Sequence, residues 1–171
     1  LAEIAQAHPD VTAGKKILIN HITFNTDGSR IVLLARTWAF WKTALFTVNR
    51  DGTGLTCLQS YGYASHYYWR DPSHVLFHSD TGGSQELYLI TDPSGKATAI
   101  DPAFFPRDGH CSYSPDLRWI LYDSYPIDGY RYLYLYDTVA RCGMTLGAFA
   151  SLPADPLDLR CDLHPRWNRA G

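Results

Sequence analysis

The sequence predicts an all-β protein, a β-propeller of four-stranded antiparallel blades, with about three blades and part of a fourth. The main observation is a histidine followed three residues later by an aromatic residue. This pattern occurs four times, at His21–Phe24, His66–Trp69, His110–Tyr113 and His164–Trp167. The histidines are spaced 45, 44 and 54 residues apart (21 to 66, 66 to 110, 110 to 164). A repeat of about 40–50 residues is typical of a propeller, with one blade per repeat.

The segments after each aromatic residue supply the other strands of a blade. Turn residues such as Asp27-Gly28 and Pro115-Asp116 follow first, because tight turns need their backbone angles. Apolar, β-branched or aromatic runs then predict second strands at 31–34, 75–77 and 119–122, and third strands at 45–48, 87–90 and 133–136. Weaker fourth strands are expected near 55–58, 97–100 and 144–146. A short uncapped helix is indicated at 1–6, and an apolar strand at 16–19 leads into His21.

We interpret residues 1–171 as one partial propeller, with blade repeats starting near 21, 66, 110 and 164. Each blade buries its faces against its neighbours, and 4–8 blades normally close the ring. Three blades and a stub would leave faces open and edges unpaired. The sequence therefore leads us to expect a fragment, truncated at both ends.

Composition excludes some function classes. The net charge is −2 and Lys and Arg form no run, so electrostatics favour neither nucleic acid nor an anionic membrane. No apolar run approaches the roughly 18 residues that a membrane helix needs. The four cysteines have no zinc-site spacing, and Cys111 and Cys161 are expected to be small buried residues. The cellular compartment stays open.

The four repeated histidines form a candidate site. Equivalent positions in successive blades share a neighbourhood at the central channel, so the imidazoles are expected to converge on one cation or one substrate. The alternative is that each histidine only bonds a neighbouring backbone group and spaces the blades. His8, His74 and His78 fall outside the pattern, and we interpret His8 as a loop residue and the other two as strand surface residues.

Polar companions stand beside two of these histidines. Asp108 precedes His110 by two residues, and Arg160 and Asp162 precede His164. Alternation along an extended chain would place Arg160, Asp162 and His164 on one face. A carboxylate and an imidazole suit Mn²⁺, Zn²⁺ or Fe²⁺, and Arg160 suits an anionic substrate. An inter-blade salt bridge is the structural alternative. Further polar residues near strand ends, which spacing does not rank, are Arg36, Arg70, Asp123 and Asp128.

The repeat resembles the TolB-type, WD40-like propeller repeat. More narrowly, the stretches around His21, 65–70, 108–116 and 160–167 resemble the oligogalacturonate lyase family. That resemblance implies a seven-bladed ring in which channel histidines bind Mn²⁺ and short pectate oligosaccharides are cleaved by β-elimination.

By the same resemblance, His110 and His164 match metal ligands, with Asp162 standing where the family has a further histidine. His66 matches the position near the catalytic base, and we assign His21, Arg160 and Arg70 to substrate binding. Ala44 stands where the family has an arginine, and the family's glutamine ligand has no match.

Two functions follow as hypotheses. The first is a lyase that uses Mn²⁺ or another divalent metal on oligosaccharides with uronate groups. The second is a non-catalytic TolB-like propeller that binds a protein or glycan partner through its rim. The histidine–aspartate pairs at 108/110 and 162/164 favour the first, and Ala44 favours the second.

Overall fold

The structure is a computed structural model that describes residues 1–37, 42–105, 107–153, 159–168 and 170–171. Two short helices, α1 (Ala2–Ala7) and α2 (Pro9–Thr12), stand at the start of the chain. No helix in the described part of the chain is long and apolar enough to cross a membrane.

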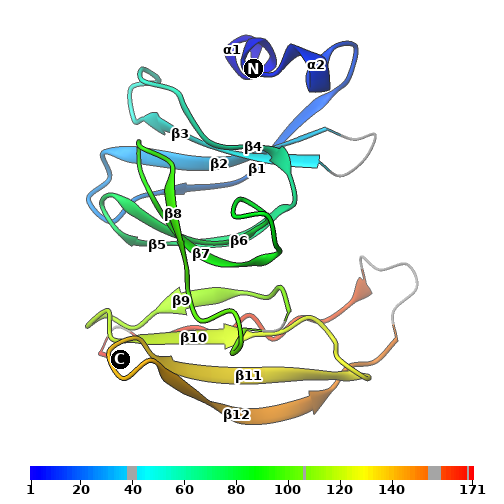
Figure 1. Cartoon of the computed structure of the whole chain (residues 1–171), viewed down its shortest axis with the longest axis vertical. Helices are drawn as coiled ribbons and strands as arrows, with labels where there is room; N and C mark the ends of the chain where they lie inside the picture. Colours follow the sequence, from blue (N-terminus) through cyan, green and yellow to red (C-terminus); the bar gives the residue numbers. More distant parts are fainter. Residues whose placement is uncertain (38–41, 106, 154–158, 169) are drawn as a thin grey trace.

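Strands make up three separate sheets that stack one after another along the molecule (Figure 1). Each sheet has four antiparallel strands in chain order, which confirms the predicted blades. The first sheet consists of β1 (Ile17–Phe24), β2 (Arg30–Thr37), β3 (Lys42–Asn49) and β4 (Thr56–Gly62). The second consists of β5 (Ala64–Asp71), β6 (His74–Ser79), β7 (Glu86–Thr91) and β8 (Lys96–Ala99). The third consists of β9 (Cys111–Tyr113), β10 (Trp119–Asp123), β11 (Tyr130–Asp137) and β12 (Cys142–Ala150).

The core lies between the blades. Val32 and Leu45 of the first blade pack in one cluster with Phe77 of the second, and all three are fully buried. Leu76 of the second blade packs in another cluster with Tyr122 of the third. Strand β6 is therefore covered on both faces, and such a strand carries a continuous apolar run rather than alternation. The adjacent residues Leu76 and Phe77 of β6 point to opposite faces of the sheet and pack in different clusters. The middle blade therefore holds the outer two together.

A polar cluster also joins the first two blades. The Arg30 guanidinium donates to both carboxylate oxygens of Asp92, at 2.5 and 2.9 Å. Thr47 donates its hydroxyl to the same carboxylate at 2.6 Å. Asp92 is buried, so these charge-assisted bonds stabilise the boundary more than a surface pair would.

Some expectations require correction. The short N-terminal helix is present, but β12 runs nine residues because it pairs with β11 from Tyr130 to Asp137. His78 was expected at the surface and is 2 % exposed, since the middle blade has a neighbour on each face. Cys161 was expected to be buried and is exposed, because residues 160–168 form no strand. These residues instead lie beside β9, where the Trp167 indole donates to the Ser112 carbonyl at 3.3 Å.

Candidate metal centre and channel

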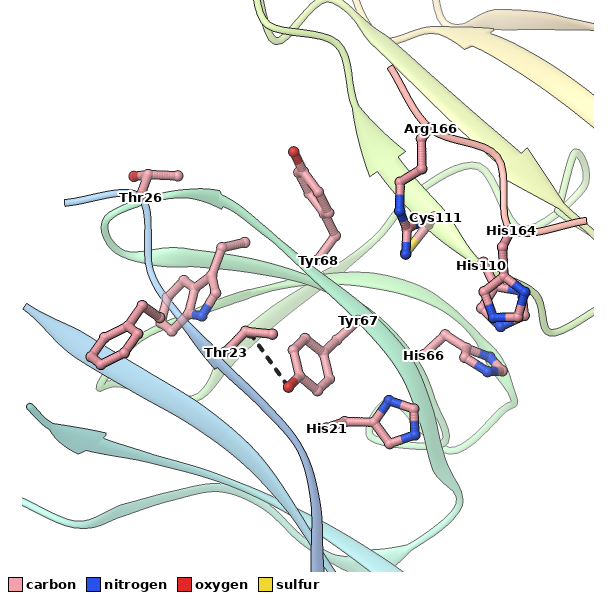
Figure 2. A pocket seen from close by; sticks show the side chains of 12 residues that line it. His21, Thr23, Thr26, His66, Tyr67, Tyr68, His110, Cys111, His164 and Arg166 are labelled. Carbon is pink, nitrogen blue, oxygen red and sulfur yellow. Dashed lines mark hydrogen bonds between the residues drawn. The ribbon is translucent and has the colours of Figure 1, made fainter. Parts of the chain in front are cut away.

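The four repeated histidines lie in one row across the three blades and the segment that follows (Figure 2). Ring centroids are 6.3 Å apart between His21 and His66, 4.0 Å between His66 and His110, and 3.6 Å between His110 and His164. Repeat superposition thus brings together side chains from positions 143 residues apart in sequence (21 to 164).

Irregular backbone helps to place the row. Strands β1 and β5 each shift register beside their histidine, between Asn20 and Thr23 and between Ala64 and Tyr67. Such bulges change the direction of a side chain. His21 and His164 also have positive φ, 51° and 46°, which is uncommon for residues other than glycine. Strained backbone of this kind gathers at functional sites.

Asp108 supports His66 from the neighbouring blade. The His66 Nδ1 lies 3.2 Å from one carboxylate oxygen of Asp108, and the Tyr63 hydroxyl donates to the other at 2.7 Å. Burial opposes ionisation of Asp108, but the hydrogen bond and charge of His66 outweigh it and lower its pKa. Because a carboxylate only accepts, the neutral form of His66 carries its proton on Nδ1 and keeps a lone pair on Nε2.

Asp123, at the end of β10, supports His110 and His164. Its carboxylate accepts the backbone N–H of His110 at 2.6 Å and that of His164 at 2.9 Å. Both of its oxygens also lie 3.1 Å from the His110 Nδ1. Burial by itself raises the pKa of Asp123. The hydrogen bonds from His110 lower it by more, so the pKa of Asp123 lies below its usual value. The His110 Nδ1 is therefore the donor, and its Nε2 is available for a ligand.

His110, His164 and Asp162 can offer three ligand atoms that all lie within 4.8 Å of one another. Two imidazoles and one carboxylate are a donor set suited to a divalent transition metal. Asp123 behind His110 is the carboxylate–histidine arrangement that fixes such ligands. Burial, with the charge of His110 next, lowers the pKa of His164 and favours the neutral imidazole that a metal needs. The residues present fit a metal ion.

Asp162 also has protein partners. The Arg131 Nη2 lies 2.7 Å from its Oδ1, and the Arg160 Nε lies 3.2 Å from its Oδ2. Arg131 belongs to β11, so its ion pair joins the third blade to the segment that follows it. The sequence had suggested an inter-blade salt bridge made by Arg160, but Arg160 pairs with Asp162 inside one segment. Both ion pairs coexist with the ligand geometry, because a carboxylate accepts several bonds.

A pocket of about 440 Å³ opens along the histidine row. The four histidines line it together with residues further along the inner strands (Figure 2). Those residues are Thr23, Phe24, Thr26, Tyr67, Tyr68, Trp69, Cys111 and Arg166. The aromatic rings provide flat apolar surface beside the imidazoles, an arrangement that suits a ring-shaped ligand with polar groups.

The remaining predicted residues are divided between the site and its surroundings. Arg160 lies at the site, where it donates to the Tyr125 hydroxyl at 3.2 Å. Arg70 is directed to Asp71, at 2.8 Å, and to the Tyr113 ring, and it does not line the pocket of the described residues. Arg36 is half-buried, and its Nε has no partner within the described part of the chain. The pKa of His21 is lowered first by burial and next by the charge of Arg36.

Sequence reasoning did not assign roles to Asp123, Tyr125, Tyr63 or Arg131. Asp123 was noted as polar at a strand end, but its partner, His110, is 13 residues earlier, directly before β9. Asp123 and Tyr125 contact the histidines, while Tyr63 and Arg131 bond the carboxylates Asp108 and Asp162 beside them. These contacts depend on how strands align across blades, which residue spacing does not encode.

Comparison with known proteins supports the fold. No protein family matches the sequence, and no curated protein matches it. Among solved structures, the chain is similar to TolB from Acinetobacter baumannii, with a TM-score of 0.61 and 20% identity over 74% of this chain and 32% of that one. It is similar to an oligogalacturonate lyase in complex with manganese, with a TM-score of 0.56 and 17% identity over 84% and 44%.

A Mycobacterium tuberculosis puromycin-hydrolyzing peptidase is also similar, with a TM-score of 0.61 and 16% identity over 78% of this chain and 22% of that one. The chain thus spans less than half the length of each of these proteins. TolB and oligogalacturonate lyase are propeller proteins, so the comparisons confirm the predicted fold and the resemblance to both. At these identities the likeness concerns the fold alone.

Proposed function

We propose that this protein is a metal-dependent lyase that cleaves uronate-containing oligosaccharides by β-elimination. The observation that carries the proposal is the cluster of His110, His164 and Asp162, with the His66 ring 4.0 Å from that of His110. A metal-ligand set directly beside an imidazole with a free nitrogen is what removal of a weakly acidic proton requires. One of the similar structures is an oligogalacturonate lyase in complex with manganese, which adds support.

The reaction divides the work among these residues. A bound Mn²⁺ would supply Lewis-acid neutralisation of the uronate carboxylate. His110, His164 and Asp162 would hold that ion, with Asp123 fixing the His110 ring. His66, with Nδ1 held by Asp108, would take the proton from the carbon next to the carboxylate at Nε2. The electron pair of the C–H bond forms a C=C bond, the C–O bond to the leaving sugar breaks, and the leaving oxygen takes a proton from solvent.

A second candidate is a non-catalytic propeller that recognises a protein or glycan. The likeness to TolB, at 20% identity, favours it, as does Ala44 at the position where the lyase family has an arginine. Ala44 is fully buried in β3, so it offers no polar group to a substrate.

Metal content and product formation test the proposal. The full-length protein and its His110→Ala variant would be incubated with Mn²⁺, dialysed and analysed for metal. We expect about one ion per chain, lost in the variant, and formation of unsaturated uronate from oligogalacturonate by the wild type only. His74→Ala is the matched control, because His74 lies outside the site, where its Nδ1 is 2.8 Å from the Asp71 Oδ1. Absence of metal from the wild type would favour the recognition propeller.

Asp108→Asn tests the role of His66 separately. An asparagine can direct its N–H₂ toward the His66 Nδ1, which would favour the wrong tautomer. We expect kcat to fall by about 10²–10⁴-fold, the range of a general base, with metal content retained and KM little changed. Tyr63→Phe removes the other bond to Asp108 and should have a smaller effect. An unchanged kcat in Asp108→Asn would show that His66 does not act as the base through this arrangement.

A further inference from the structure

A second pocket, of about 640 Å³, lies beside the histidine row without sharing a lining residue with the first pocket, within the described part of the chain. We call it the arginine pocket. It is formed by the β10–β11 connection, β11 and the segments on either side of 154–158. Its lining residues are Tyr125, Pro126, Gly129, Arg131, Ser151, Leu152, Pro153 and Arg160.

Arg131 is the unusual member of this pocket. Its side chain is 3% exposed, yet Nε and Nη1 have no hydrogen-bond partner among the residues that the structure describes, where Nη2 alone reaches Asp162. A buried guanidinium with two unpartnered groups carries a desolvation cost that an acceptor would relieve. Nearly all buried polar groups in proteins are paired, so this deficit points to an absent acceptor.

The charge around the pocket favours an anion. Arg131 and Arg160 contribute two guanidinium groups, and the Asp162 carboxylate offsets one of them. Tyr125 adds no negative charge, because burial raises the pKa of its hydroxyl. Planar guanidinium groups match the two oxygens of a carboxylate better than an ammonium does.

The remaining lining groups favour a ring attached to that anion. Tyr125, Pro126, Leu152 and Pro153 supply apolar surface, and the Tyr125 ring lies 5.3 Å from the Arg160 Cζ and 5.8 Å from the Arg131 Cζ. Tyr125 also connects the two pockets, since its ring centroid is 5.5 Å from that of His66. A ligand in the arginine pocket therefore lies next to the proposed base.

We propose that the arginine pocket binds the carboxylate of a second uronate residue, next to the one processed at the histidine row. This inference rests on the proposed function for its substrate class. It makes the pocket a specificity element that favours two adjacent acidic sugars over a neutral one, because a hydroxyl group offers the arginines one uncharged acceptor where a carboxylate offers two charged oxygens.

Binding measured without metal tests this inference. The full-length protein in a chelator would be titrated with galacturonate, and with galactose as the neutral counterpart, by isothermal calorimetry or ligand-observed NMR. We expect galacturonate alone to bind, and Arg160→Gln to weaken it by at least tenfold. Ser151→Glu should do the same without altering a partner of Asp162, because its carboxylate would compete for the arginines. Arg118→Gln, a surface arginine paired with Asp137, is the control.

The outcome separates this inference from the lyase proposal. Equal binding of galactose, or galacturonate binding that both Arg160→Gln and Ser151→Glu leave unchanged, overturns the arginine pocket, whether or not the protein holds metal. Selective galacturonate binding lost in both variants supports it, even if His110→Ala shows that the metal proposal fails.

Discussion

Replacing Asp123 by asparagine tests whether this carboxylate orients the ligands of the proposed metal centre. The Asp123 side chain is 1% exposed and its two oxygens accept from three N–H groups, two backbone and one imidazole. Asparagine has nearly the same shape but keeps only one acceptor. Whichever way its amide turns, the N–H₂ group faces an N–H of His110 or His164.

The expected loss follows from the indirect role of Asp123. Groups that orient a ligating histidine typically change metal affinity by about 10- to 100-fold, which corresponds to about 1.4–2.8 kcal/mol. The full-length variant would be titrated with Mn²⁺, and its Kd compared with that of the wild type. We also expect a lower Tm, because a buried N–H group loses its acceptor.

Asp128→Asn is the matched control for this titration. Asp128 undergoes the same chemical change, is exposed, and has a positive φ of 50°, which asparagine tolerates. A Kd for Mn²⁺ within about twofold of wild type in Asp123→Asn, with a normal circular dichroism spectrum, would refute the argument that Asp123 orients the ligands.

Three further predictions concern folding. In Gly109→Ala the new Cβ would overlap the Asp123 backbone carbonyl oxygen, so we expect a loss of at least about 1–3 kcal/mol in urea unfolding. A wild-type unfolding midpoint would contradict the packing described. Phe77→Ala removes a fully buried ring between the first two blades and should cost about 3–5 kcal/mol in the same assay, whereas a cost below 1 kcal/mol would mean that this boundary is loosely packed. The hydrogen bond from Arg118 lowers the pKa of Asp137 to about 2, so this pair stabilises the fold above the ordinary carboxyl range near 4, and its contribution is lost as pH falls through about 2. The difference in unfolding free energy between wild type and Arg118→Gln should therefore shrink between pH 4 and pH 2, and a constant difference would show that Asp137 is not the partner that matters.

Repetition explains why much of the fold could be predicted. A histidine at one point of a superposable unit predicts where the next histidine lies, so the row from His21 to His164 follows from spacing alone. The apolar runs at 31–34 and 75–77 likewise predict the second strands of their blades. Strand ends were less predictable, because pairing with β11 rather than local propensity decides how far β12 extends.

The contacts across blades could not be read from the sequence. His78 follows the three apolar residues 75–77 and was expected at the surface, yet it is buried, with its Nδ1 3.6 Å from the Asp108 carboxylate. Tyr125 lies in the β10–β11 connection and Arg131 in β11, the third strand of its blade, where no repeat pattern singles them out. Their proximity to the histidine row depends on blade geometry, that is, on how one sheet is rotated against the next.

One regularity becomes visible only when the repeat and the structure are combined. Asp108 begins the third repeat but contacts His66 of the second blade, and Asp162 begins the next repeat but lies with His110 of the third. Each carboxylate thus serves the histidine of the preceding blade. The same position, two residues before the histidine, holds Ile19 and Ala64 in the earlier repeats. In this series Asp108 lies beside His66, and Asp162 lies beside His110 and His164, whereas neither of the two earlier positions offers His21 a carboxylate. Under the proposed function, the steps that need a carboxylate, as a metal ligand or as support for a base, would therefore take place at the last two blade boundaries, and His21 would contact the ligand without such support.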